Sequence, residues 1–359
     1  MKAIVRRGTQ LIEDDLADPV PGEGQALVST LVCGICGSDL HALHHLDHMI
    51  ALTRRAGGLE NLDPSQDVVF GHEFCAEVLD YGPGCTGALK PGTRVVSVPA
   101  AFSAQGSELV GYSNLYPGGF AERMVLQEAL LLPVPNGLDA ERAALTEPMA
   151  VGEHAVAQAP LTPASVALVI GCGPVGLSVI SALKARGVGP VIATDFSPER
   201  RRAAEALGAD VVLDPREHSP YDRWEDFDVP ATMASFSASQ LMGRSIRDAV
   251  VFECVGVPGM IQQLIEKVPP TAAIIVVGVC MESDTIEPSL AINKQLSLKF
   301  VYGYSPEEFA ATLGEIADGN RDVTPLMSGT VGRSQVKDAF ASLMGGGGQI
   351  KLLVDPRRA

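Results

Sequence analysis

The chain has 359 residues, 46% of them hydrophobic and 19% charged, and its 43 acidic and 27 basic side chains give a formal net charge of −16. This length is typical of two domains, and the apolar content excludes an intrinsically disordered chain. The acidic balance argues against binding to nucleic acid or to an anionic membrane, because either partner requires concentrated positive charge.

The seven cysteines do not indicate a disulfide framework, because their number is odd and they are spread thinly along the chain. A reducing compartment is therefore favoured. Residues 1–7 carry charges before the apolar core of a signal peptide can form. Together these features predict a cytoplasmic protein.

Short apolar or alternating runs in the first part of the chain predict β-strands. Pro-Gly pairs separate the runs, for example Pro83-Gly84 and Pro91-Gly92, and such pairs mark turns. This rhythm predicts an irregular, many-stranded β domain. The expected strands lie at 26–32, 75–79, 94–98 and 124–126.

From about residue 151 the pattern changes to apolar strands that alternate with helices. Such alternation predicts a parallel sheet covered on both faces, and hence an α/β chain. The uncharged stretch 155–183 is not a membrane span, because prolines and glycines divide it into a strand, a turn and a helix. The expected strands are 166–170, 191–194, 211–213, 249–253 and 273–277, with helices at 175–186, 198–207 and 258–267 and, near the end, a helix at 334–343 and a strand at 350–354.

The motif Gly171-Cys172-Gly173-Pro174-Val175-Gly176 lies between an expected strand and an expected helix. That context predicts a dinucleotide site, in which the glycines allow a tight turn and a close approach to the pyrophosphate at the helix N-terminus. Asp195 ends the next strand, about 20 residues further on, where a carboxylate accepts hydrogen bonds from ribose hydroxyls and repels a 2′-phosphate. NAD is therefore favoured over NADP, although the nearby Arg200 could weaken that preference. Ser197 fits the N-cap of the next helix better than Asp195 does.

Three separated segments carry side chains that bind metal ions. They contain Cys36, the adjacent pair His72 and Glu73, and Glu147. No second Cys-x-x-Cys accompanies residues 33–36, so a closed site of four thiolates is not indicated, and the mixed donors suit a catalytic zinc with an open position. Each residue alone also has an ordinary structural explanation, such as a buried thiol, a core histidine or a carboxylate at a helix start.

These segments resemble the zinc-dependent medium-chain dehydrogenases, which include alcohol, polyol and threonine dehydrogenases. The Gly-Ile-Cys-Gly-Ser-Asp-Leu-His, Gly-His-Glu, Glu-Pro-Met-Ala-Val-Gly and dinucleotide motifs occur in the family's order over nearly the whole chain. The resemblance implies a GroES-like catalytic domain formed by residues 1–150 and 299–359, and a doubly wound Rossmann domain over residues 151–298.

The resemblance also implies roles for the metal-binding side chains. Cys36 and His72 correspond to zinc ligands, and Asp39 to the acid that orients the ligand histidine. Glu147 stands where the polyol branch has Glu and the alcohol branch has Cys, and it is either a ligand or a partner of the zinc-bound water. Glu73 resembles a carboxylate that approaches the metal during exchange. Cys33 matches no ligand position and is expected to be a small buried residue.

Ser38 and His41 resemble the first and last groups of the family's proton relay, and an imidazole suits proton transfer near neutral pH. His44, His45 and His48 follow closely, so a solvated histidine-rich turn is the alternative interpretation of His41.

Further positions correspond by resemblance to cofactor contacts. Val277, Gly278 and Val279 resemble one backbone segment that binds the carboxamide, and Tyr302 and Gly303 resemble a second. Lys351 resembles the basic residue near the pyrophosphate. Gly37 replaces a residue that is often basic in the family, which removes one phosphate contact.

Two departures from the family stand out. No cysteine lies between residues 100 and 119, so one catalytic zinc ion per chain and no structural zinc are expected. The segment at 44–66 is enlarged and partly helical in pattern, and we expect it to shape the substrate pocket. Arg54 or Arg55 could meet an acidic substrate group there, or they could be solvated charges on an exposed helix.

The sequence therefore predicts a zinc-dependent oxidoreductase that transfers hydride between a secondary alcohol or polyol and NAD, giving a ketone or aldehyde. The alternatives are a zinc-assisted dismutase or lyase with retained NAD, a zinc-free double-bond reductase of the same fold, and a cofactor-binding protein without catalysis. The expected partners are a small alcohol or carbonyl compound and further copies of the chain. A homodimer or homotetramer formed through residues 273–298 is expected by resemblance.

Overall fold

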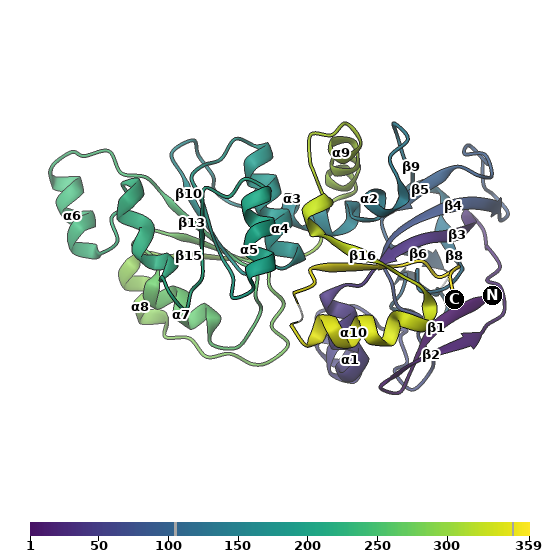
Figure 1. The fold of residues 1–359 in the computed structure, drawn as a ribbon. Helices are drawn as coiled ribbons and strands as arrows, with labels where there is room; N and C mark the ends of the chain where they lie inside the picture. The colour runs from purple at the N-terminus through teal and green to yellow at the C-terminus, as the bar shows by residue number, and fades with distance from the viewer. Residues whose placement is uncertain (104–105, 347) are drawn as a thin grey trace. The chain divides into compact units, whose positions relative to one another are not determined.

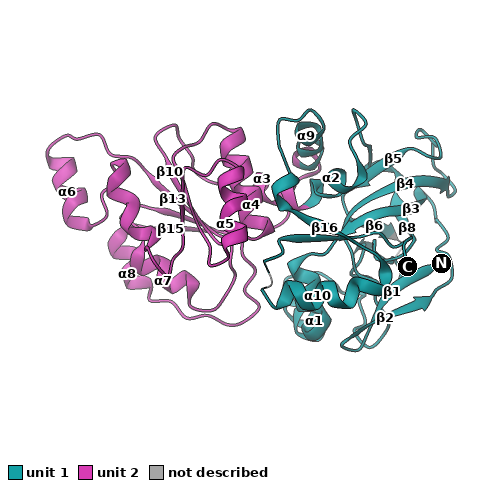
Figure 2. Ribbon diagram, in the orientation of Figure 1, with its two compact units in different colours: residues 1–147, 309–359 teal, residues 148–308 magenta. Residues whose placement is uncertain are grey.

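The structure is a computed structural model that describes residues 1–103, 106–346 and 348–359 (Figure 1). The chain forms two compact units, Met1–Glu147 with Phe309–Ala359, and Pro148–Glu308 (Figure 2). The first boundary lies close to the predicted one at residue 150. The second lies after residue 308 rather than 298, because residue 298 falls inside β15 (Ser297–Phe300), which is hydrogen-bonded into the sheet of the second unit.

Unit 1 is built on a seven-stranded sheet of order β16-β17-β3-β4-β5-β9, in which β8 also pairs with β3. Two hairpins, β1–β2 and β6–β7, form separate two-stranded sheets that the sequence pattern did not predict. The irregular β domain is confirmed. Its strands are β1 (Lys2–Arg7), β2 (Gln10–Asp15), β3 (Gln25–Gly34), β4 (Glu73–Tyr81), β5 (Arg94–Ser97), β6 (Ala100–Ser103), β7 (Gly106–Leu109), β8 (Arg123–Gln127), β9 (Leu131–Pro133), β16 (Met327–Val331) and β17 (Lys351–Val354).

Strand β3 brings distant parts of unit 1 together. It pairs antiparallel with β4, placing Gly34 opposite Glu73, and with β17, placing Gly34 opposite Leu353. The segment after β3, the start of β4 and the start of β17 therefore meet, although about 300 residues of sequence separate the first from the last. Three buried phenylalanines contribute to the core around this sheet: Phe70, Phe120 and Phe340.

The helices of unit 1 include α1 (Gly37–Arg55), which confirms the helix expected in the enlarged segment. Apart from Asp39, its buried residues are small or aliphatic, and it packs against α10 (Val336–Met344). The short helix α2 (Ala140–Ala144) packs on β3 and β4. Two longer helices cross the boundaries between the units in sequence: α3 (Thr146–Ala157) and α9 (Pro306–Ala317).

Unit 2 contains a six-stranded sheet in which each strand pairs in parallel with its neighbours, in the order β12-β11-β10-β13-β14-β15. The chain leaves β10 in one direction to β11 and β12 and then crosses to β13 on its other side. Right-handed crossovers therefore place α4 and α5 on one face and α7 and α8 on the other, as Figure 1 shows. The strands are β10 (Val166–Ile170), β11 (Val191–Thr194), β12 (Val211–Leu213), β13 (Ala249–Glu253), β14 (Ala273–Val276) and β15.

Two helices of unit 2 start where proline and the N-cap residue predicted them. Helix α4 (Pro174–Ala185) begins with Pro in its first turn, and α5 (Pro198–Ala206) is capped by Ser197, whose hydroxyl accepts a hydrogen bond from the Arg200 amide. The other helices are α6 (Met233–Leu241), α7 (Met260–Lys267) and α8 (Pro288–Lys294). Within the described residues, no helix is both long enough and apolar enough to cross a bilayer.

Candidate active site

Three predicted metal-binding side chains meet in unit 1. Cys36, His72 and Glu73 each offer one ligand atom, and these atoms lie within 4.8 Å of one another. Cys36 is the N-cap of α1, so its sulfur lies at the positive end of the helix dipole. Because β3 and β4 pair with Gly34 opposite Glu73, both strands deliver their donors to the same end of the sheet.

The glycine at the end of β3 is required by this packing. A Cβ atom on Gly34 would lie 2.1 Å from Oε2 of Glu73, which is closer than any real contact. The side chain of Glu73 therefore occupies the space above Gly34. The motif Gly34-Ile35-Cys36 thus provides both a ligand and room for the neighbouring carboxylate.

His72 lies in a strongly negative environment. Its Nδ1 atom is buried without a hydrogen-bond partner among the described residues and lies 3.6 Å from Oδ1 of Asp39. Burial alone would lower the pKa of His72, but the charges of Asp39, Cys36 and Glu147 outweigh it and hold that pKa well above its usual value. The cluster therefore favours a bound positive charge at or beside the imidazole.

Asp39 is fixed by bonds on two sides. Its Oδ2 accepts a hydrogen bond of 3.0 Å from the backbone N–H of Cys36, and its Oδ1 accepts one of 2.9 Å from the hydroxyl of Tyr112. Burial is the largest influence on this carboxyl and raises its pKa. Asp39 therefore lies where a carboxylate can orient His72, as the resemblance implied.

Tyr112 is a site residue that sequence reasoning missed. Its oxygen lies 3.0 Å from Oγ of Ser38, and its ring centroid lies 5.5 Å from that of His72. Burial and the charge of Asp39 raise the pKa of Tyr112 well above its usual value, so the hydroxyl keeps its proton. Since that proton is donated to Asp39, the Ser38 hydroxyl is the donor to Tyr112. No local motif marks Tyr112, because both partners are more than 70 residues away.

Lys351 has a different partner from the one predicted. Its ammonium donates hydrogen bonds to Oε1 and Oε2 of Glu73, both at 2.7 Å, and to the carbonyl of Ile35 at 3.0 Å. Both side chains of the pair are only 1% exposed. Burial is the largest single influence and lowers the pKa of Lys351, but the charges of Glu73, Cys36 and Glu147 and the hydrogen bonds to Glu73 together outweigh it, so the pKa is raised. These three hydrogen bonds lie inside unit 1, and the contact of Lys351 with the pyrophosphate stays a prediction.

The remaining predicted residues of unit 1 lie around this cluster. Glu147 lies in the first turn of helix α3, and its charge raises the pKa of both His72 and Lys351. His41 is exposed on α1, one turn after Ser38. Cys33 is fully buried, as expected.

Arg54, at the end of α1, bonds to the loop that follows the helix. Arg54 donates hydrogen bonds to the carbonyls of Leu59, Glu60 and Leu62, of which the bond to Leu62 is 2.7 Å long. Arg54 therefore closes the loop that follows the helix. The prediction that Arg54 meets an acidic substrate group does not fit this arrangement, whereas Arg55 is exposed.

The predicted dinucleotide motif has the expected geometry in unit 2. Gly171 starts the turn after β10 with φ of +87°, and a Cβ atom on Gly176 would overlap the carbonyl oxygen of Gly171. Only glycine therefore allows α4 to approach the turn so closely. The loop lies beside β13, where the order of strand connection reverses, which is the usual location of ligand sites in such sheets.

Asp195 follows β11 and bonds to the dinucleotide loop. Its Oδ2 accepts a hydrogen bond of 2.8 Å from the amide of Cys172, and its Oδ1 accepts one of 2.7 Å from the amide of Ser197. Arg200 lies 3.9 Å from Oδ2 of Asp195, and the same guanidinium lies 3.9 Å from a Cβ built on Gly173. The structure thus brings Asp195 and Arg200 together beside the predicted phosphate loop.

The other predicted cofactor residues lie at the carboxyl ends of neighbouring strands. Val277 and Gly278 follow β14 and both donate their amide protons to the carbonyl of Glu253, at 2.9 Å. Val279 is exposed, and Tyr302, after β15, is 86% exposed. Because the strands are parallel, these segments and the glycine loop share one edge of the sheet.

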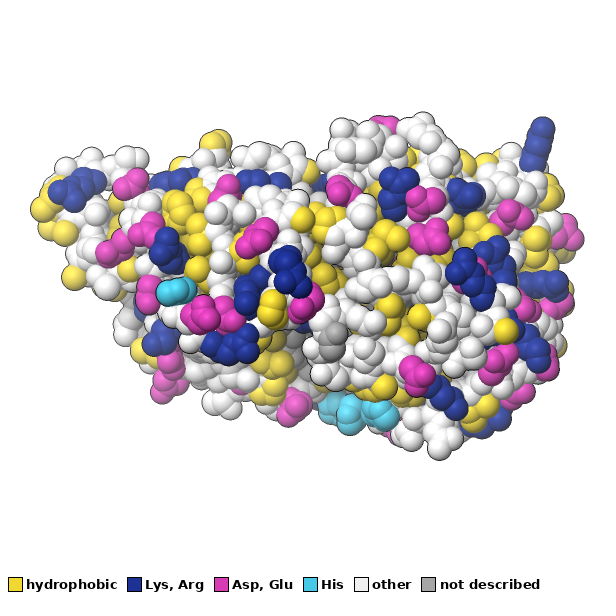
Figure 3. Space-filling model, viewed as in Figure 1, with side chains coloured by type: hydrophobic (Ala, Val, Ile, Leu, Met, Phe, Trp, Pro, Cys, Tyr) yellow, Lys and Arg dark blue, Asp and Glu magenta, His cyan; other side chains and the backbone are white. Residues whose placement is uncertain are grey.

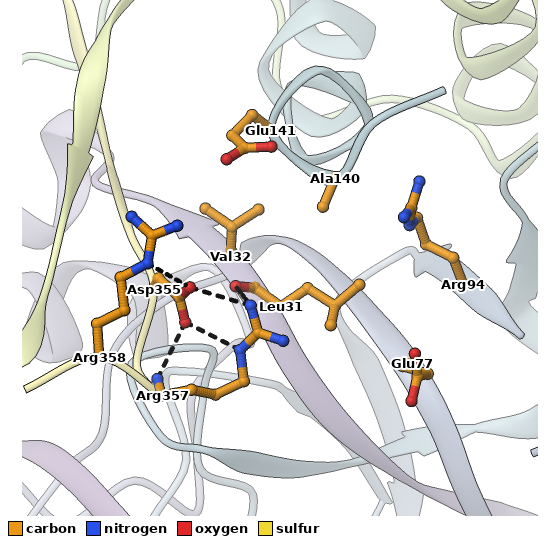
Figure 4. Close-up of a pocket in the computed structure, with 9 residues that line it drawn as sticks. All are labelled: Leu31, Val32, Glu77, Arg94, Ala140, Glu141, Asp355, Arg357 and Arg358. Atoms are coloured by element: carbon orange, nitrogen blue, oxygen red, sulfur yellow. Dashed lines mark hydrogen bonds and ion pairs between the residues drawn. The ribbon is translucent and has the colours of Figure 1, made fainter. Parts of the chain in front are cut away.

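A polar hollow of about 280 Å³ lies elsewhere in unit 1 (Figure 4). Arg357 and Arg358 both bind the carboxylate of Asp355 there, at 2.9 and 3.0 Å. The three arginines and three acidic residues of the lining balance each other in charge, and none of them belongs to the Cys36 cluster. We attribute these contacts to anchoring of the C-terminal segment. The lining consists of Leu31, Val32, Glu77, Arg94, Ala140, Glu141, Asp355, Arg357 and Arg358.

Comparison with known proteins identifies the family. The alcohol dehydrogenase GroES-like domain matches residues 22–136, and the zinc-binding dehydrogenase domain matches residues 174–318. The chain is 32% identical over 352 residues to (R,R)-butanediol dehydrogenase of Bacillus subtilis, covering 96% of both chains. The chain belongs to the zinc-type medium-chain alcohol and polyol dehydrogenases. The resemblance inferred from the motifs is thereby confirmed.

Two further relatives agree with this assignment. Sorbitol dehydrogenase of Bacillus subtilis is 30% identical over 270 residues, covering 68% of this chain and 73% of the relative. The crystal structure of 2R,3R-butanediol dehydrogenase from Bacillus subtilis matches with a TM-score of 0.78 at 28% identity and covers 99% of both chains. The expected fold class, a GroES-like domain with a Rossmann domain, is confirmed, and the protein is an oxidoreductase of the alcohol and polyol class that uses zinc and a nicotinamide cofactor.

Proposed function

We propose that this dehydrogenase oxidises a secondary alcohol of a small diol or polyol to the ketone, with NAD as the hydride acceptor. The observation that carries the proposal is the convergence of Cys36, His72 and Glu73, within 4.8 Å of one another, in a chain similar to butanediol and sorbitol dehydrogenases. The alternatives without alcohol oxidation have no feature of their own in this site.

The donor set fits one catalytic zinc ion, because a thiolate, an imidazole and a carboxylate are common ligands of zinc sites that keep an open position. We assign Cys36 and His72 as ligands, with Glu147 as a third ligand or a partner of bound water, and expect no structural zinc. When bound, zinc supplies a Lewis acid that polarises the substrate oxygen. Oδ1 of Asp39 lies 3.6 Å from Nδ1 of His72, where the carboxylate is placed to orient the ring. Lys351 neutralises Glu73, so that carboxylate can approach the metal only when this pair opens.

The hydroxyl of Ser38 is suited to receive the alcohol proton. Its oxygen lies 3.0 Å from the Tyr112 hydroxyl, and as it accepts the alcohol proton it turns its own proton away from Tyr112 and gives it to the next group of the relay. His41, one helical turn further along α1, is exposed and would pass the proton to water. The bound nicotinamide supplies the hydride acceptor, and the protein's part is to remove the proton and orient the alcohol.

Replacing Tyr112 by Phe tests this orientation. We expect kcat to fall about tenfold and the solvent isotope effect on kcat to increase, because a Ser38 hydroxyl without its acceptor makes proton transfer slower. Zinc content should not change. The matched control is Tyr116→Phe, since the Tyr116 hydroxyl accepts a hydrogen bond from Gln25 outside the cluster. An unchanged isotope effect in Tyr112→Phe would refute a role in the relay.

NAD preference is assigned to Asp195. In Asp195→Asn the ribose acceptor loses its charge while the side chain keeps its shape, so we expect kcat/KM with NAD to fall about tenfold and the value with NADP to rise. Arg200→Gln is the paired variant and should lower kcat/KM with NADP instead. Steady-state kinetics with both cofactors measures these ratios, and a wild-type preference for NADP would contradict the assignment.

The reaction itself is tested by following NADH formation with vicinal diols, polyols and simple secondary alcohols. The proposal expects the highest kcat/KM among diols or polyols and a requirement for zinc. Turnover of activated double bonds with no oxidation of any alcohol would instead support the reductase alternative.

Oligomers formed through unit 2 are a further part of the proposal. Edge strand β15 is exposed along its length, and Phe300 and the nearby Ile292 are 66% and 73% exposed. An exposed apolar sheet edge favours pairing with a second copy. These features support a homodimer or homotetramer.

We also place the protein in the cytoplasm, since its seven cysteines are free.

A further inference from the structure

Two neighbouring strands of the sheet in unit 2 are each followed by an aspartate. Strands β11 and β12 pair in parallel, so the residues that follow them, Asp195 and Asp214, begin neighbouring loops at the same edge of the sheet. The proposed function uses Asp195 as the acceptor of the ribose hydroxyls, but it gives Asp214 no role. The side chain of Asp214 is nevertheless only 10% exposed.

The carboxylate of Asp214 binds two arginines. Its Oδ2 lies 2.9 Å from Nη1 of Arg201, on α5, and 2.7 Å from Nη2 of Arg216, whose Nε donates to Oδ1 at 2.9 Å. The hydrogen bonds from Arg216 and the charge of Arg201 hold the pKa of Asp214 well below its usual range, although burial opposes them. The carboxylate is therefore charged at neutral pH. Figure 3 shows basic and acidic side chains mixed over the face of unit 2 on which α5 lies, as expected for paired charges.

The same two arginines hold the backbone of the loop that carries Asp195. Arg201 donates from Nη1 to the carbonyls of Asp195 and Phe196, at 2.8 and 3.0 Å. Arg216 donates from Nη2 to the carbonyl of Phe196, at 2.6 Å, and its guanidinium lies 5.6 Å from the centre of the Phe196 ring. Two cations that share one carbonyl oxygen repel each other, and the carboxylate of Asp214 offsets that repulsion. The arginines therefore stay on the loop because Asp214 is charged.

We propose that Asp214 is a positioning residue for the nicotinamide dinucleotide, which acts through Arg201 and Arg216 to hold the loop that presents Asp195 to the ribose. This inference rests on the proposed function, because that function assigns Asp195 as the ribose acceptor. The carboxylate of Asp195 is bonded to two backbone amides, and the arginines hold the backbone that carries it. A binding group is precise only when its supporting contacts fix it, so a shift of this loop weakens the contact with the ribose.

Strand β12 offers a matched control, because an ion-paired aspartate also lies at its other end. Asp210 precedes β12, and its Oδ2 lies 3.0 Å from Nζ of Lys184 and accepts a hydrogen bond of 2.7 Å from the amide of Val191. Asp210→Asn removes the same charge beside the same strand, but at the edge of the sheet opposite the dinucleotide loop. An effect on cofactor binding that is confined to Asp214→Asn therefore reports on the position of the loop rather than on the stability of the sheet.

Binding is measured by the fluorescence of NADH, which requires no turnover. Asp214→Asn should raise the Kd of NADH and the KM of NAD about tenfold, because a neutral amide can accept from one arginine only and no longer offsets their repulsion. The value of kcat should not fall, since weaker NADH binding does not slow product release. Asp210→Asn should keep both constants within about twofold of the wild type. Asp214→Glu restores the charge and should recover part of the affinity.

An equal loss of affinity in Asp214→Asn and Asp210→Asn, or no loss in Asp214→Asn, would overturn the proposal. Arg216→Gln carries the test if Asp214→Asn does not fold, since the side chain of Arg216 is 59% exposed. This variant removes the bond to the carbonyl of Phe196 and should raise the Kd of NADH about fivefold. Unchanged affinity in Arg216→Gln would likewise refute the positioning role.

A double-mutant cycle with Asp195→Asn separates this inference from the proposed function. If Asp214 acts through Asp195, the loss of NADH affinity in Asp195→Asn/Asp214→Asn should be smaller than the product of the two single losses. A full product would place the effect of Asp214 outside Asp195 and would contradict the proposal. If Asp195→Asn weakens NADH binding and Asp214→Asn does not, the assignment of Asp195 stands and the positioning role is refuted. If Asp195→Asn binds NADH as the wild type does, the assignment of Asp195 itself fails.

Discussion

Replacing Cys36 by Ala should remove the zinc ion and abolish turnover. The thiolate is the ligand that most favours zinc over magnesium or calcium in this donor set, so we expect less than about 0.1 zinc per chain. A Lewis acid contributes several kcal/mol to the transition state, and its loss corresponds to about a thousandfold lower kcat/KM. Metal analysis and NADH-coupled kinetics measure the two effects.

The matched control is Cys33→Ala, which removes a thiol three residues earlier. Cys33 is fully buried, and its Sγ lies 3.6 Å from the carbonyl of Gly34 rather than in the cluster. This variant should keep its zinc and most of its activity. NADH binding, measured by fluorescence, should persist in both variants because the dinucleotide loop belongs to unit 2. Full activity of Cys36→Ala without zinc would refute the metal assignment.

Lys351→Met should destabilise unit 1 by about 3–5 kcal/mol, because it leaves the buried carboxylate of Glu73 without its partner. The single tryptophan, Trp224, lies in unit 2, so its fluorescence does not report on this change. Hydrogen exchange of the amides in β3, β4 and β17 measures the free energy of opening where the pair is located.

The double variant Lys351→Met/Glu73→Gln completes this experiment. Removing both charges should restore most of the lost stability, because the remaining groups are neutral and similar in volume. The wild type, Lys351→Met, Glu73→Gln and the double variant form a double-mutant cycle, which gives the coupling energy between Lys351 and Glu73. If Lys351→Met alone changed the exchange by less than about 1 kcal/mol, the carboxylate would have another compensating partner, and the account of Glu73 would need revision.

The sequence predicted unit 2 well because strong local signals determine its elements. The strands at Val166–Ile170, Val191–Thr194, Val211–Leu213 and Ala249–Glu253 have the predicted bounds. Each is a short apolar run buried by helices on both faces of the sheet. Helix α6 and the buried Trp224 were missed, because the polar stretch around them shows no regular period.

Unit 1 was predictable only in its general character. Its strands are short, and pairing between distant segments decides which of them form, as in the pairing of β3 with β17. The same reason explains the site. Cys36, His72 and Glu73 were found from motifs, whereas Tyr112 and the partner of Lys351 depend on contacts with residues about 70 to 300 positions away.

X-ray absorption at the zinc edge of the purified protein shows whether Cys36 and His72 bind one zinc ion. Cys36, His72 and a carboxylate holding one ion predict one zinc per chain with a single sulfur at about 2.3 Å and nitrogen or oxygen neighbours at about 2.0–2.2 Å. The sulfur signal should be absent from any residual zinc in Cys36→Ala. A protein free of zinc, or a zinc ion surrounded by several sulfur atoms, would contradict this account of the site.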